Sequence, residues 1–235
     1  MRFVKGVVFA SALALAVPAV HMLAQGAGAG QAKQADEKDR AVAGGGITVP
    51  GWTGKVDAGS AKQGRTINDS KFTQAGGEFH LEVGPAASYW SPKNFAKGDY
   101  TVRATFKNVK SDAGHPHSAG LFIAGTAMDT ENPTYLYCVA YTDGKFLVRQ
   151  FNGTPKPVTL VAPTANAAVK GPDAAGGATN DIAWVVKGGK ADCMINNTSV
   201  GSFDLAALKV PSLDGIYGIR VTHNMNLNVA GFGMK

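Results

Sequence analysis

The feature that most constrains this chain is a series of short runs in which apolar and polar residues alternate between turn-forming residues. A period of two is typical of strands with one buried face, and no stretch keeps the apolar period of 3.6 that a helix needs. We therefore predict an all-β domain of two packed antiparallel sheets, with one helical turn at Asp204–Lys209. The predicted strands are Glu78–Val83, Tyr100–Val109, Ala119–Ala124, Tyr135–Tyr141, Phe146–Phe151, Ile182–Lys187, Ala191–Asn196, Ile216–Thr222 and Met225–Phe232.

The N-terminus has the layout of a signal peptide. Arg2 and Lys5 precede the apolar run Val7–Val20, and small residues follow it. The run is shorter than the ~20 residues of a membrane span, so we predict a cleaved signal peptide at 1–24 and no stable membrane span. An uncleaved anchor helix is the alternative. Residues 25–46 are expected to form a flexible Gly/Ala-rich linker before a domain at 47–235, and the predicted localisation is secreted or periplasmic.

Composition narrows the function. Hydrophobic residues make up 45% of the chain and charged residues 17%, which supports a sizeable core. The formal charge of +6 is scattered along the sequence, so no nucleic-acid partner is expected. No phosphate-binding, dinucleotide-binding or zinc-finger spacing is present, and we predict no cofactor.

Two hairpins can be predicted closely. Asp143-Gly144 between apolar runs favours a two-residue turn, which pairs Tyr141 with Phe146. That register places Phe146 and Gln150 on the same face as the tyrosines of the preceding strand. The second hairpin turns at Gly188-Gly189 and puts the apolar side chains on one face.

The second hairpin turns Cys193 inward. Cys138 lies on the less aromatic face of the first hairpin. If that face is also core, the two sulfurs can meet across the sandwich as a disulfide. The alternative is two buried free cysteines that behave as small hydrophobic residues.

Several motifs, in their order along the chain, resemble a known family. They are Gly98-Asp99-Tyr100-Thr101-Val102, Gly120-Leu121-Phe122-Ile123, Asp143 to Arg149, Trp184 with Cys193 to Asn197, and Gly215 to Val221. The order resembles concanavalin A-like lectin/glucanase jelly rolls over Ile47–Lys235. It is most similar to secreted bacterial domains related to the 3-keto-disaccharide hydrolase family. The resemblance implies a jelly-roll sandwich, a fold that hosts lectins, hydrolases and structural modules.

The catalytic motif of the glucanase branch is absent. That branch would show a Glu-x-Asp-x-x-Glu strand, whereas the domain contains only Glu78, Glu82 and Glu131 as glutamates. A retaining glycosidase needs two carboxyl groups at close range. We therefore predict no catalytic residues, although a pair built from aspartates stays open.

Two sets of residues are candidates for binding a sugar. Aromatic side chains can stack on sugar rings, although most strand aromatics belong to the core. These candidates are Tyr89, Trp90, Tyr135, Tyr137 and Tyr141. Arg103, Arg220, Asn226 and Asn228 alternate with apolar neighbours and are expected to line a polar groove, or else to be plain surface.

Metal-like spacing occurs in one loop. The loop contains a His-x-His pair, His115 and His117, and a nearby carboxylate, Asp112. Side chains of these types at this spacing can ligate a metal ion. The alternative is two unrelated histidines in a surface loop, and we predict no metal.

The leading functional prediction is a secreted or periplasmic carbohydrate-binding β-sandwich protein. One alternative is a glycoside hydrolase resembling the 3-keto-disaccharide hydrolases. The other is a structural or assembly protein of the cell surface that self-associates. An aromatic groove without converging carboxylates would favour binding, and a flat apolar face would favour assembly.

Overall fold

The computed structural model of the protein describes residues 1–2, 38–112 and 114–235. The predicted signal peptide lies outside the described residues apart from Met1 and Arg2, as does the predicted linker up to residue 37. Among the described residues, no helix is long and apolar enough to cross a membrane.

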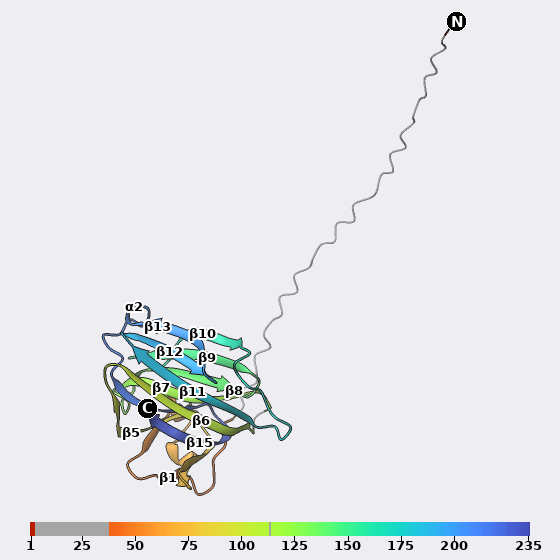
Figure 1. Cartoon of the computed structure of the whole chain (residues 1–235). Coiled ribbons are helices and arrows are strands. Elements are labelled where there is room, and N and C mark those ends of the chain that lie inside the picture. The colour runs from red at the N-terminus through yellow and green to blue at the C-terminus, as the bar shows by residue number, and fades with distance from the viewer. Residues whose placement is uncertain (3–37, 113) are drawn as a thin grey trace. The chain divides into compact units, whose positions relative to one another are not determined.

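The described strands form two sheets (Figure 1). The eight-stranded sheet contains, in spatial order, β1 (Gly46–Ile47), β3 (Lys71–Ala75), β4 (Glu78–Val83), β15 (Met225–Met234), β6 (Tyr100–Ser111), β11 (Ala178–Lys187), β12 (Lys190–Ile195) and β13 (Thr198–Asp204). The seven-stranded sheet contains β10 (Val158–Ala165), β9 (Lys145–Asn152), β8 (Thr134–Tyr141), β7 (Ser118–Thr126), β14 (Gly215–Val221), β5 (Ala87–Ala96) and β2 (Thr53–Val56). Every described pair except β1 with β3 is antiparallel.

The all-β sandwich is therefore confirmed, and each predicted strand lies within a residue or a few residues of an observed one. Helical structure is limited to α1 (Ala58–Lys62), the 3₁₀ turn η1 (Ile67–Asp69) and α2 (Leu205–Leu208), the last inside the predicted helical turn. The prediction missed the short strands β1, β2 and β3 and the edge strand β13. It also missed β5, in which Pro92 interrupts the strand pattern, and β10, an edge strand with no buried residue. Neither β5 nor β10 carries the half-buried pattern from which the other long strands were predicted.

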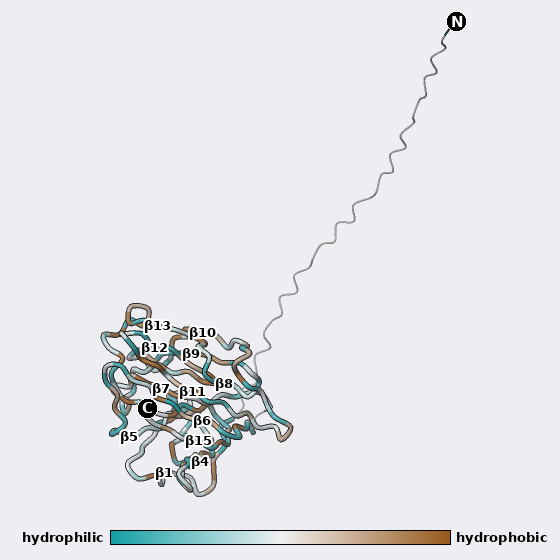
Figure 2. The backbone as a smooth tube through the Cα atoms, viewed as in Figure 1, coloured by the Kyte–Doolittle hydropathy of each residue, from teal (hydrophilic) through white to brown (hydrophobic). Residues whose placement is uncertain are grey.

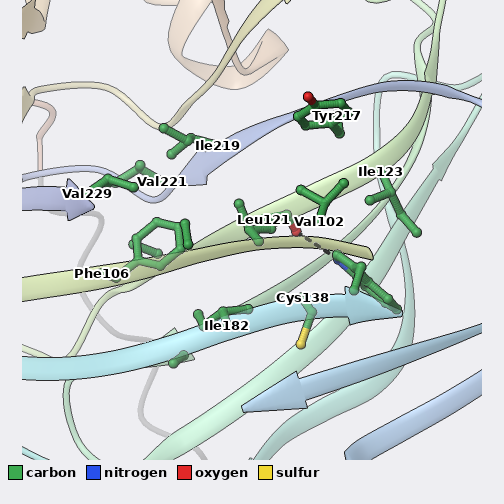
Figure 3. Packing of buried hydrophobic residues seen from close by; sticks show 14 of the residues in the cluster. Val102, Phe106, Leu121, Ile123, Cys138, Ile182, Tyr217, Ile219, Val221 and Val229 are labelled. Carbon is green, nitrogen blue, oxygen red and sulfur yellow. Dashed lines mark hydrogen bonds between the residues drawn. The ribbon is translucent and has the colours of Figure 1, made fainter. Parts of the chain in front are cut away.

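Alternation places one face of each sheet in a common core. Buried and more exposed residues alternate along β6 and β12, and Figure 2 shows hydrophobic and hydrophilic stretches interspersed throughout the folded domain. The inward side chains interlock between the sheets (Figure 3), where Phe106, Leu121, Ile182 and Ile219 are 0–1% exposed. Burial of this apolar surface is the main force that holds the two sheets together.

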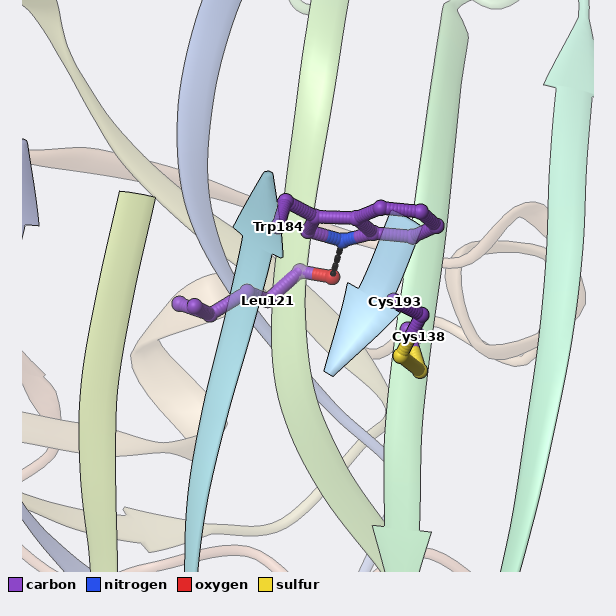
Figure 4. The surroundings of a disulfide bond; sticks show 4 residues. All are labelled: Leu121, Cys138, Trp184 and Cys193. Atoms are coloured by element: carbon purple, nitrogen blue, oxygen red, sulfur yellow. Dashed lines mark hydrogen bonds between the residues drawn. A yellow bond between two sulfur atoms is a disulfide. The ribbon is translucent and has the colours of Figure 1, made fainter. Parts of the chain in front are cut away.

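A disulfide joins the two sheets through this core. Cys138 of β8 and Cys193 of β12 are bonded, with their Cα atoms 6.3 Å apart (Figure 4). Beside it, the Trp184 indole Nε1 donates a hydrogen bond of 3.1 Å to the Leu121 carbonyl oxygen, again from one sheet to the other. The predicted disulfide is confirmed, as is the inward face of the second hairpin, in which Trp184 pairs with Cys193.

The predicted register of the first hairpin is wrong by one residue. Ala140, not Tyr141, pairs with Phe146, and Cys138 pairs with Val148. The turn is one residue longer than predicted, with Gly144 at a φ of 86°. A shift of one residue in register moves each side chain of the strand to the opposite face of the sheet. Phe146 therefore points into the core between the sheets and not to the face that carries the tyrosines.

The folded domain begins before the predicted boundary at residue 47. The backbone N–H of Val42 donates to the Asp69 carbonyl oxygen at 3.0 Å, and that of Gly46 donates to Ser70 at 2.7 Å. The Arg40 side chain donates to the carbonyl oxygens of Val83 and Met225. Residues 38–46, predicted as linker, therefore belong to the domain. These residues are held to the domain by hydrogen bonds rather than by an apolar face, so the sequence shows no hydrophobic period from which their packing could be predicted.

Removing the disulfide should lower stability strongly. The bond closes a loop with a sequence separation of 55 residues, for which loop entropy predicts a loss of about 4 kcal/mol in the free energy of unfolding. We expect this loss in Cys138→Ala/Cys193→Ala, measured by chemical denaturation. Two alkylatable thiols in the unfolded, unreduced wild-type protein would contradict the bond.

Candidate functional site

The outer face of the seven-stranded sheet carries two neighbouring rows of registered side chains. Residues that pair across strands lie side by side on the same face. One row contains Lys55, Ser88, Arg220, Gly120, Val139 and Leu147. The next contains Thr53, Trp90, Gly218, Phe122, Tyr137 and Arg149.

Arg220 is the charged centre of this face. It is 4% exposed, and its guanidinium donates to both Asp57 carboxylate oxygens, at 2.6 and 2.5 Å. It also lies 5.4 Å from the centroid of the Tyr137 ring, within cation–π range. Burial is the largest single influence and lowers the pKa of the guanidinium, but the charge and hydrogen bonds of Asp57 together with Tyr135 and Tyr137 outweigh it, so the pKa of Arg220 lies above its usual value.

Aromatic side chains pack around the arginine as a rigid floor. Tyr135 stacks on Phe151 with ring centroids 4.7 Å apart, and its hydroxyl lies 3.1 Å from Ser88 Oγ. Burial raises the pKa of Tyr135, although the charge of Arg220 opposes the shift. The outer cluster has the following buried members: Trp90, Phe122, Met128, Tyr135, Tyr137, Val139, Leu147 and Phe151.

Two segments partly cover the outer cluster. Asp57 precedes α1, so its ion pair draws the start of this helix onto the sheet. The second segment is the loop that contains Asp129 and Thr130. Lys55 Nζ holds this loop by donating to the Thr130 carbonyl oxygen and, at 3.3 Å, to that of Asp129. Between the segments remains a pocket of about 50 Å³, lined by Trp90 and Tyr135 among others. A space of this size holds water rather than a sugar ring.

Beside the small pocket the same face opens into a wide groove of about 850 Å³. Trp90 borders both spaces. Phe95 in the groove is 54% exposed, one of the few large hydrophobic side chains so exposed among the described residues. The groove is lined by Thr53, Gly54, Lys55, Trp90, Pro92, Phe95, Gly125, Thr126, Ala127, Met128, Asp129 and Ile216.

The predicted aromatic platforms are divided by the structure. Tyr89 points into the core between the sheets, 0% exposed and 5.3 Å from the Phe72 ring centroid, and burial raises its pKa to about 12. It is therefore a core residue and not a platform. Tyr135 and Tyr137 are 3% and 4% exposed and form the floor of the outer face, while Tyr141 packs at its margin.

The predicted polar groove does not form, because its residues lie on different sheets. Arg103 and Asn226 belong to the outer face of the eight-stranded sheet, whereas Arg220 belongs to the other sheet. Arg103 donates to Asp181 at 2.8 Å, and Asn226 accepts a hydrogen bond from Arg40 at 2.8 Å. These contacts are those of a solvated strand face.

The sequence analysis missed Asp57, Phe95 and Lys55. Asp57 is adjacent to Arg220 only through the fold, since 163 residues separate them. Phe95 follows the proline that disrupts the alternation of β5. A lone Phe beyond a proline gives no sequence signal that distinguishes a surface residue from a core residue.

A histidine cluster lies at the ends of β7 and β14. His115, His117 and His223 each offer a ligand atom within 4.8 Å of the others. Burial, followed by the neighbouring histidines, lowers the pKa of His117 to about 4. Asp112, the third candidate metal ligand predicted from the sequence, instead bonds to Arg40 and Asn226.

The Arg220–Asp57 pair should be costly to break. Removal of one partner from a buried pair costs about 3–5 kcal/mol, and the lower end applies because a third of the Asp57 side chain is exposed. We expect Asp57→Asn to lower the free energy of unfolding by about 3 kcal/mol. The matched control, Asp181→Asn in the more exposed Arg103 pair, should cost less than about 1 kcal/mol. Equal losses, measured by chemical denaturation, would contradict a structural role for the pair.

Comparisons with known proteins give the fold but no close relative. No protein-family model and no curated protein matches the chain. The carbohydrate-binding module CBM66 from Bacillus subtilis superposes with a TM-score of 0.54 and 10% identity, covering 81% of this chain and 98% of that one. The laminarinase catalytic domain from Thermotoga maritima superposes with a TM-score of 0.51 and 10% identity, covering 82% and 96%.

A further similar structure is a protein of unknown function with a galectin-like fold from Bacillus subtilis. Its TM-score is 0.50 at 12% identity, with coverage of 78% of this chain and 88% of that one. Identities of this size establish the fold alone. Together with the two-sheet topology, they show that the chain folds as a jelly-roll β-sandwich.

Proposed function

We propose that this protein binds carbohydrate in the groove on the outer face of the seven-stranded sheet. The observation that carries the proposal is Phe95, which is 54% exposed in a groove of about 850 Å³ and shares that groove with Trp90. Aromatic rings supply large apolar contact faces at low conformational cost, and concave sites combine such faces with a few polar groups.

The polar groups of the groove suit hydroxyl recognition. Thr53 and Thr126 offer hydroxyls, and Asp129 offers a carboxylate. Lys55 is held in place by carbonyl oxygens of the facing loop, so its cation is positioned before any ligand arrives. Trp90 and Met128 belong both to the outer cluster and to the lining of the groove, so packing within that cluster holds these two side chains in place and lowers the entropy cost of binding.

A glycosidase is less well supported by the carboxylates near the groove. Asp57 already gives both oxygens to Arg220. Glu131, which lines the small pocket, has a side chain that is 82% exposed and lies 3.8 Å from Lys55. Asp129 lines the groove, but among the described residues the lining holds no second carboxylate beside it. A glycosidase needs a pair of carboxyl groups at the scissile bond, and this lining does not supply that pair.

Assembly through a flat apolar face is also less well supported. Among the described residues after residue 37, the exposed large hydrophobic side chains are Phe95, Val158 and Met234. They lie on β5, β10 and β15, strands that do not neighbour one another. Self-association normally uses a contiguous apolar patch.

The similar structures are compatible with carbohydrate binding but do not distinguish it from catalysis. One of the similar structures is named as a carbohydrate-binding module and another as the catalytic domain of a laminarinase, so the fold serves both functions. The proposal of binding rather than catalysis therefore rests on the aromatic groove and on carboxylates that do not form a catalytic pair there.

The test is a glycan array, followed by calorimetry with the strongest glycan. Phe95→Ala should weaken binding by about 1–2 kcal/mol, the loss expected for one aromatic contact, without lowering stability. The matched control is Val158→Ala, whose side chain is equally exposed on β10. Unchanged affinity in Phe95→Ala would refute the groove as the binding site.

We also propose that the protein is secreted or periplasmic. The disulfide supports this proposal, because such bonds persist in oxidising compartments. Mass spectrometry of the exported protein should find an N-terminus between Gln25 and Gly30. An intact Met1 would contradict the predicted processing.

A further inference from the structure

We infer that His115, His117 and His223 form a binding site for a divalent transition metal, with zinc as the expected ion. Their ligand atoms lie within 4.8 Å of one another. None of the three lines the groove of the proposed function, so the inference is independent of it.

Strand pairing creates the cluster. Ala119 of β7 pairs with Val221 of β14, and the backbone N–H of Thr222 donates to the Ser118 carbonyl oxygen at 2.9 Å. Continuing this antiparallel register by one residue sets His117 opposite His223, and their ring centroids are 4.2 Å apart. The sheet itself therefore positions two of the three ligands.

His115 completes the cluster from the same loop as His117. It lies two residues before His117, across Pro116, and the two ring centroids are 4.3 Å apart. Ligands of a tetrahedral zinc ion at about 2.0–2.1 Å lie about 3.3 Å from one another. The ligand atoms already lie within 4.8 Å of one another, so closing the cluster onto an ion shortens their separations by about 1.5 Å at most.

Asp39 supplies the supporting carboxylate that metal-bound histidines usually have. Its Oδ1 lies 2.8 Å from His223 Nδ1, and its Oδ2 accepts a hydrogen bond of 2.6 Å from Ser60 Oγ. A carboxylate only accepts, so His223 Nδ1 carries the proton, which leaves the lone pair of Nε2 available to a metal ion. Such a partner fixes the tautomer and raises the basicity of the ligand nitrogen.

His117 gives a second, independent reason for a ligand. It is 6% exposed, and its Nε2 is buried without a hydrogen-bond partner. An unsatisfied buried polar atom costs stability and requires an explanation. A metal ion between the rings would satisfy this nitrogen.

The donor set indicates the class of metal. Three neutral imidazoles without a thiolate suit zinc, copper or nickel rather than calcium or magnesium, which prefer oxygen ligands. Three protein ligands also leave a fourth position for water or an exogenous ligand, as in open zinc sites.

The experiment uses the purified protein without a polyhistidine tag, stripped with a chelator and titrated with Zn²⁺ by calorimetry. We expect saturable binding of one ion per chain. Co²⁺ added instead should give the visible absorption of a tetrahedral site, and Zn²⁺ should displace it. Absence of saturable binding would overturn the inference.

Variants locate the site. His115→Ala and His223→Ala should each abolish the one-to-one binding and the cobalt spectrum, while Asp39→Asn should weaken zinc affinity about 10–100-fold. The matched control is His80→Ala, which removes a histidine bonded to Asn228 on the other sheet and should leave affinity unchanged. Because His115 is only half-buried in its loop, its variant should stay folded, as circular dichroism will show. Binding that survives in His115→Ala/His223→Ala would overturn the site.

Discussion

The fixed distance between the two sheets is the constraint on which the other features depend. Cys138–Cys193 and the hydrogen bond from Trp184 to Leu121 connect the sheets through the centre of the core. With one face of every central strand committed to this core, the opposite face of the seven-stranded sheet is free to carry polar and aromatic groups. Among the described residues, the outer cluster shares no buried residue with the core between the sheets, so its side chains and those of the groove are not required for packing the two sheets together.

A buried charge organises that outer face. Arg220 would be costly in an aromatic surrounding without a partner, and Asp57 reduces that cost by neutralising it. The pair fixes Tyr137 beneath the guanidinium and holds the chain before α1 against the sheet. Such a pair contributes little net stability over apolar packing, but it specifies one arrangement of the floor.

Alternation and turn chemistry predicted the sandwich, most strands and the disulfide, because these depend on local period and on the facing of short hairpins. The register of β8 with β9 was wrong, since Asp143-Gly144 is compatible with loops of two or three residues. The polar groove failed for a different reason. Alternation shows that Arg220 and Asn226 leave the core, but it does not show from which sheet. Sheet membership is a property of strand order, which no local pattern encodes.

The N-terminal segment contributes to both candidate sites. Asp39 forms a hydrogen bond with His223, and Asp57 forms an ion pair with Arg220. Two carboxylates from one short stretch of chain thus contact two basic side chains at or just after β14. A chain that began at Ile47, the predicted boundary, would keep the Arg220–Asp57 ion pair on the outer face of the seven-stranded sheet. It would lose the carboxylate that sets the tautomer of His223, because Asp39 lies before that boundary. Asp39 is therefore part of the proposed metal site, and residues 38–46 are not a spacer that precedes the domain.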